Sequence, residues 1–258
     1  MTKQLLIYEN AVPISAAAHA DVSVRTGYNW NFAAQLNSVP VLVPEMEPAC
    51  AEMPIVFTGQ ADSLTPVALM GLQSGENLFV TADGGWSGRY IPAFLRRYPF
   101  VFAETGADGK TLTLCIDEAY EGVNRAGRGE RLFDSEGTRT QYLGNMLKFT
   151  TDYQTQHNLT RAFCQTLTEL ALLEPAVATV TRADGTTATL TGFQRVNRDK
   201  LAALPDDRLA EMFRNGMLGL IYFHIASLGH LAALGQRDTR TAAPSDAPAQ
   251  PAEESAQA

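Results

Sequence analysis

Cysteine and histidine are scarce in this chain of 258 residues, which has three cysteines and four histidines. No two cysteines are spaced C-x-x-C, and no histidines form an H-x-H or H-E-x-x-H pattern. The sequence therefore lacks a local metal-ligand motif, and we expect neither a metal nor a cofactor. Three widely separated cysteines, Cys50, Cys115 and Cys164, predict free thiols in a reducing compartment, which favours the cytoplasm.

Positive charge is also limited. The chain has 20 Lys and Arg against 28 Asp and Glu, and its net charge is −8. Nucleic-acid binding depends on clustered Lys and Arg that neutralise phosphates, so this balance argues against a nucleic-acid partner.

The common catalytic signatures are missing too. The sequence contains no G-x-G-x-x-G, no G-x-x-x-x-G-K-[ST] and no G-x-S-x-G. These patterns build dinucleotide sites, phosphate loops and the nucleophile turn of many hydrolases. No catalytic residue can be named from a motif.

Long apolar runs are few. Residues 5–8 are too short an apolar run for a signal peptide. Residues 216–235 carry no Asp, Glu, Lys or Arg and could just span a bilayer. We consider three interpretations of this helix: a buried core helix, a face for a second copy of the chain (a homo-oligomer through residues 206–235), or a membrane anchor. In the first two, His224 and His230 should be hydrogen-bonded.

Strand patterns dominate the first half of the chain. Apolar or β-branched runs predict strands at 39–43, 54–58, 66–72, 77–80, 100–103 and 111–116. Asp108-Gly109 predicts a hairpin between the last two of these strands.

Helical spacing begins at residue 138. Apolar residues three and four apart predict a long helix over 138–173, with a break near His157-Asn158. A hairpin follows around Asp184-Gly185, and a last long helix begins at Pro205. We therefore expect an α+β fold, in which a β-rich portion (1–135) packs on two long C-terminal helices with a small hairpin between them (136–235). Residues 1–235 form one domain, and the polar composition of 236–258 predicts a disordered tail.

Residues 75–100 combine aromatic and guanidinium side chains at unusual density. The candidate binding residues are Trp86, Arg89, Tyr90, Arg96 and Arg97. Arginine beside aromatic rings suits carboxylate or phosphate recognition. The structural alternative is that the arginine stems cover apolar surface and the charges pair with nearby acids.

With these residues in view, the chain resembles the SapC family of bacterial proteins over roughly residues 20–234. The resemblance rests on PIVF (54–57), VALMGL (67–72), GENLFV (75–80), YIPAFLRRYPF (90–100), LCID (114–117), LFD (132–134) and ASLGHL (226–231). The family name implies a link to surface-layer or cell-envelope processes. It supplies no catalytic residues.

Two hypotheses of function follow. In the first, the protein is a non-catalytic accessory protein that binds a protein or peptide partner through Trp86, Arg89, Tyr90, Arg96 and Arg97. In the second, it is an enzyme whose site is assembled from distant residues, with Arg96 or Arg97 as an anion clamp and Asp117 or a histidine as the acid–base group.

Overall fold

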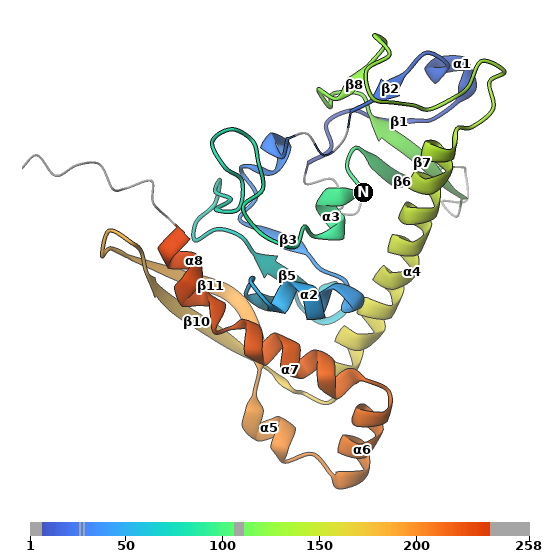
Figure 1. Cartoon of the computed structure of the whole chain (residues 1–258). Helices are drawn as coiled ribbons and strands as arrows, with labels where there is room; N and C mark the ends of the chain where they lie inside the picture. The colour runs from blue at the N-terminus through green and yellow to red at the C-terminus, as the bar shows by residue number, and fades with distance from the viewer. Residues whose placement is uncertain (1–6, 26, 28, 106–110, 238–258) are drawn as a thin grey trace, which may run out of the picture.

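A five-stranded antiparallel sheet joins the two halves of the chain. The computed structural model describes residues 7–25, 27, 29–105 and 111–237 (Figure 1). The strand order is β10-β11-β4-β5-β3. The strands are β3 (Ser38–Pro40), β4 (Ile55–Thr58), β5 (Thr65–Leu69), β10 (Leu173–Thr181) and β11 (Thr187–Val196). The predicted hairpin is thus β10–β11, and it pairs with the β-rich portion through Gln194 and Phe57.

Two smaller sheets lie in the upper part of Figure 1 and have the orders β1-β7-β6 and β8-β2-β9. Their strands are β1 (Ala11–Pro13), β2 (Ser23–Val24), β6 (Phe100–Thr105), β7 (Thr111–Asp117), β8 (Val123–Asn124) and β9 (Glu130–Arg131). The predicted pairing of β6 with β7 is confirmed. The turn at Asp108-Gly109 lies outside the described residues.

Helix α4 (Gln141–Glu169) runs along one side of the molecule, from the small sheets to the level of the large one (Figure 1). Thr140 caps it by accepting a hydrogen bond from the Leu143 N–H. The predicted break near His157-Asn158 is wrong, because α4 is continuous there. Residues with low helix propensity, such as His157 and Asn158, lower helix stability by only tenths of a kcal/mol relative to alanine. Burial of apolar residues of α4, such as Phe163, stabilises the helix by more than this.

The predicted last long helix is three helices. After α5 (Arg198–Ala202) come α6 (Asp206–Arg214), α7 (Met217–Ser227) and α8 (His230–Arg237). Gly216, at φ +82°, separates α6 from α7, because this left-handed backbone suits glycine. Helix α8 includes residues 236 and 237, which the predicted tail contains; residues 238–258 lie outside the described part of the chain.

The apolar stretch 216–235, considered above as a membrane anchor, forms helices α7 and α8. Among the described residues, no single helix is long and apolar enough to cross a membrane. Helices α7 and α8, bent by 43°, meet the length and composition test only as a pair. Helix α7 buries Ile221, His224 and Ser227 against the protein interior.

The described residues form two hydrophobic cores, and α4 contributes side chains to both. The larger core contains Phe57, Phe94 and Phe163 and lies around the five-stranded sheet. The smaller core contains Phe100 and Leu143 and lies between the small sheets and the first turns of α4. The short helices are α1 (Ala16–His19), α2 (Met46–Cys50), α3 (Ala93–Arg96), η1 (Asn31–Ala33), η2 (Val43–Glu45) and η3 (Ala61–Ser63). The α+β prediction is confirmed.

Candidate functional site

Residues 75–100 form a loop that covers one end of the larger core. The predicted strand at 77–80 is absent apart from a single bridge between Val80 and Trp86. Gly84, at φ +81°, allows the tight turn between them. Phe79, Phe94 and the short helix α3 hold the loop on the core, with Phe79 and Phe94 buried. The loop is therefore fixed by packing rather than by sheet pairing.

Trp86 is half-buried and contributes to this packing. Its ring stacks on Phe79 at a centroid distance of 5.5 Å and meets Trp30 edge-on at 5.9 Å. Its Nε1–H donates a 3.0 Å hydrogen bond to the backbone oxygen of Tyr90. The indole therefore orients the loop that carries Arg89 and Tyr90.

Two glutamates that the sequence analysis did not single out hold Tyr90 in place. The Tyr90 hydroxyl donates to Glu45 Oε1 at 2.7 Å, and the N–H of Ala93 donates to the same oxygen. Glu52 accepts the backbone N–H groups of Arg89 and Tyr90. Burial, followed by the nearby Glu45 charge, raises the pKa of Tyr90 well above its usual value, so the phenol remains a neutral donor.

Arg96 is exposed yet held in one position. Its Nε–H donates to the backbone oxygen of Ile91 at 2.9 Å. Its guanidinium carbon lies 5.7 Å from the Tyr90 ring centroid and 5.4 Å from that of Phe149 on α4. Within the described ranges, no carboxylate lies within ion-pair distance of Arg96 or of the exposed Arg89.

Arg97 points the opposite way and is only 2% exposed. Its guanidinium carbon lies 4.3 Å from the Tyr153 ring centroid, 4.9 Å from Phe94 and 5.9 Å from Tyr8. Its Nε and Nη2 have no hydrogen-bond partner among the described residues. Burial raises the pKa of Tyr153 to about 12, with Arg97 acting in the opposite direction. Arg97 is therefore a core residue in this structure, separate from the surface that carries Arg96.

This placement makes Arg97→Met a sharp test of the role of Arg97. Burying a cation with part of its hydrogen-bonding groups unsatisfied costs several kcal/mol, which the ring contacts only partly offset. A flexible methionine can keep contact with the same rings. We expect Arg97→Met to have an unfolding free energy equal to or above that of the wild type, measured by urea denaturation. A loss of more than about 2 kcal/mol of unfolding free energy would show that the Arg97 charge stabilises the fold. Arg96→Met, at an exposed arginine, is the control.

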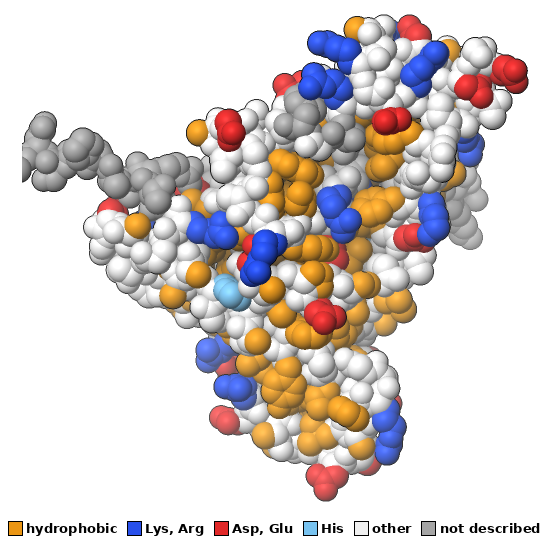
Figure 2. All heavy atoms as spheres, viewed as in Figure 1, with side chains coloured by type: hydrophobic (Ala, Val, Ile, Leu, Met, Phe, Trp, Pro, Cys, Tyr) orange, Lys and Arg blue, Asp and Glu red, His pale blue; other side chains and the backbone are white. Residues whose placement is uncertain are grey.

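Arg237 joins the same face from the end of α8. Its guanidinium carbon lies 4.2 Å from the Phe79 ring centroid, and its Nη1 donates to Ser87 Oγ at 3.1 Å. A cavity of about 620 Å³ opens beside it, lined also by Asn31, Asn77, Thr81 and Ser87. Sequence reasoning missed Arg237 because it follows the apolar helix directly and resembles the start of the tail. Figure 2 shows Lys and Arg side chains over the middle of the molecule, with hydrophobic side chains and some Asp and Glu side chains between them.

Asp117, His19 and His224 lie elsewhere. Asp117 is fully buried and accepts hydrogen bonds from the N–H groups of Glu9, Asn10 and Ala119 and from the Tyr98 hydroxyl. His19 is buried beside Glu118 in the upper part of the molecule. His224 lies inside the larger core and is taken up below. In the described part of the chain, these groups do not converge with Arg96 on one cavity.

The cysteines show no activation. All three are free thiols. Burial raises the pKa of Cys164 to about 12 and raises those of Cys50 and Cys115 above the usual value. Thiols with raised pKa values stay protonated and react slowly at neutral pH. In the ranges that the structure covers, no group of three or more His, Cys, Asp or Glu side chains is arranged to hold a metal ion.

Comparisons with known proteins give a family but no characterised relative. The SapC family model matches residues 14–234. No curated protein and no solved structure matches the chain.

Proposed function

The chain belongs to the SapC family, and from this premise we propose that it is a non-catalytic accessory protein that binds an acidic protein or peptide segment. The proposed site, here called the arginine face, consists of Trp86, Arg89, Tyr90, Arg96 and Arg237. Arg97, which was expected in this site, is left out because it is buried.

The observation that carries the proposal is the fixed position of unneutralised guanidinium groups. Arg96 is held by the Ile91 oxygen and two rings, and Arg237 by Ser87 and the Phe79 ring. Neither forms an ion pair with a described carboxylate. An arginine that is already ordered loses less entropy when a carboxylate binds, so its charge contributes more to affinity.

The surroundings of these arginines also suit a protein partner. Trp86, Tyr90 and Ile91 are half-buried and present apolar surface beside the charges. Tyrosine, tryptophan and arginine are the residues most often found at energetically important interface positions. The net charge of −8 would repel an acidic partner elsewhere on the molecule and so favours binding at a local cationic face.

The biological setting is part of the proposal. The family name supports a role linked to surface-layer or cell-envelope processes, and the three free thiols support action in the cytoplasm. The homo-oligomer remains a prediction: Phe213 on α6 is 75% exposed and Tyr222 on α7 is 52% exposed.

A capture experiment with matched variants tests this function. Tagged wild type, Arg89→Glu/Arg96→Glu and Arg198→Glu/Arg214→Glu would be used as bait in a lysate of the source bacterium, with bound proteins quantified by mass spectrometry. All four arginines are exposed, and both double variants change the net charge equally. We expect a partner whose recovery falls at least about tenfold with the first variant and is unchanged with the second. Equal recovery with all three baits would contradict the proposal.

A further inference from the structure

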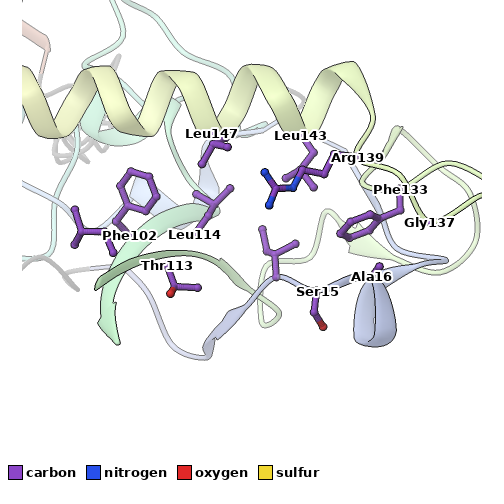
Figure 3. A pocket seen from close by; sticks show the side chains of 12 residues that line it. Ser15, Ala16, Phe102, Thr113, Leu114, Phe133, Gly137, Arg139, Leu143 and Leu147 are labelled. Carbon is purple, nitrogen blue, oxygen red and sulfur yellow. The ribbon is translucent and has the colours of Figure 1, made fainter. Parts of the chain in front are cut away.

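A second hollow lies beside α4 at Leu143 and Leu147, near Phe149, the α4 residue that Arg96 of the arginine face contacts. It is a cavity of about 480 Å³ between the first turns of α4 and strand β7 (Figure 3). Its walls are formed mainly by Phe102, Leu112, Leu114, Phe133, Leu143 and Leu147. The hollow is open to solvent, since Leu112 on its wall is 44% exposed. The volume lies within the range of small-molecule sites.

The polar chemistry of this cavity comes mainly from one side chain. Among the described residues that line it, Arg139 alone carries a charge. Figure 3 shows its guanidinium directed toward the gap between α4 and the sheet. The backbone of Arg139 is fixed by a bridge to Phe133, and α4 begins two residues later. No described carboxylate lies within ion-pair distance of Arg139.

We propose that this cavity binds a small amphiphile with one carboxylate and an unbranched apolar chain, such as a medium-chain fatty acid. The leucine and phenylalanine walls take up the chain, since burial of each methylene is favourable. Arg139 at the mouth pairs with the carboxylate through two parallel N–H donors. The positive end of the α4 dipole lies nearby and favours the same sign of ligand. The residues involved differ from those of the arginine face, so the two proposals stand or fall separately.

Calorimetric titration with three ten-carbon probes tests the inference: decanoate, decanol and decyltrimethylammonium. The wild type should bind decanoate saturably, decanol more weakly and the cation least. Arg139→Gln should weaken decanoate binding about tenfold while leaving decanol binding unchanged, because only the carboxylate contact is lost. Leu147→Trp, which fills the cavity, should weaken both. Arg214→Gln, an exposed arginine on α6, is the control and should bind as the wild type does.

Thermal melting of each variant separates loss of binding from loss of folding. Leu147 is half-buried, so Leu147→Trp should melt within a few degrees of the wild type. If it unfolds, Arg139→Gln alone decides the matter through the ratio of decanoate to decanol affinity. The inference is overturned if the wild type shows no saturable decanoate binding, if decanol binds as tightly as decanoate, or if Arg139→Gln leaves that ratio unchanged.

Discussion

Replacing His224 by phenylalanine should lower the unfolding free energy by about 2–5 kcal/mol. His224 is fully buried, and its ring lies between strands β4 and β11. Its Nε2 accepts the Val196 N–H at 3.1 Å, and its Nδ1–H donates to the Ile55 oxygen at 2.8 Å. The two strands pair at Gln194 and Phe57, so Val196 and Ile55 lie opposite each other two positions further on in the same antiparallel register. The imidazole thus bridges two backbone groups that do not bond to each other directly. Phenylalanine would leave the Val196 N–H without a partner and the Ile55 oxygen with only a long, 3.5 Å hydrogen bond from Ser227 Oγ.

The same contact makes stability depend on pH. Burial lowers the pKa of His224 to about 4 from an ordinary value of 6.5. The unfolded chain therefore binds the proton more readily than the folded one. The stabilisation that neutral His224 contributes is fully present above pH 6.5 and is lost as the pH falls toward 4. Over this range the unfolding free energy decreases by about 3 kcal/mol in total. If Nε2 were protonated, it could no longer accept the hydrogen bond from the Val196 N–H, because both groups would then be donors.

Urea denaturation of the wild type and His224→Phe at several pH values between 7 and 4 measures both effects. The difference in unfolding free energy between the two proteins should shrink steadily as the pH falls. His230→Phe, on a half-buried histidine of α8, should cost less than about 1 kcal/mol. A constant difference across this pH range would rule out neutral His224 as the strand bridge.

Asp117→Asn should destabilise the protein by about 2–4 kcal/mol, although the two side chains have nearly the same volume. Each carboxylate oxygen accepts two hydrogen bonds. Oδ1 accepts from Asn10 and Ala119, and Oδ2 accepts from Glu9 and the Tyr98 hydroxyl. An amide nitrogen in either position would meet backbone N–H groups as a second donor. The segment before β1 would lose its attachment to β7.

The control for this prediction is Asp62→Asn, an exposed aspartate in η3, which should change stability by less than about 0.5 kcal/mol. Hydrogen exchange of the Glu9 and Asn10 amides adds a local readout. These amides should exchange faster in Asp117→Asn than in the wild type. If they stay protected and stability is unchanged, Asp117 does not anchor this segment, and the acid–base role considered for it becomes the better explanation of its position.

Short sequence patterns correctly predicted several helices and turns. Asp184-Gly185 marked the β10–β11 turn, where Gly185 has a φ of +83°. Apolar residues three and four apart marked α4. Both elements are set by neighbours in the chain, so a short window of sequence contains the information.

What the sequence could not provide comes from contacts between distant segments. The pairing of β11 with β4 joins residues far apart in the chain, and it depends on His224 from a third segment. Arg96 and Arg97 are adjacent on one turn of helix, so periodicity cannot say which is buried. The core around Tyr8, Phe94 and Tyr153 decides it. Arg237 reached the candidate site only because α7 and α8 fold back over the large sheet.

Selection from a random peptide display library tests most directly whether the arginine face binds acidic segments. The baits would be the wild type, Arg89→Glu/Arg96→Glu and Arg198→Glu/Arg214→Glu, each panned under identical salt conditions. We expect the wild type and the second variant to enrich peptides rich in Asp and Glu beside aromatic residues, and the first variant to lose that enrichment. Enrichment of the same acidic peptides by all three baits, or no enrichment by the wild type, would contradict the account.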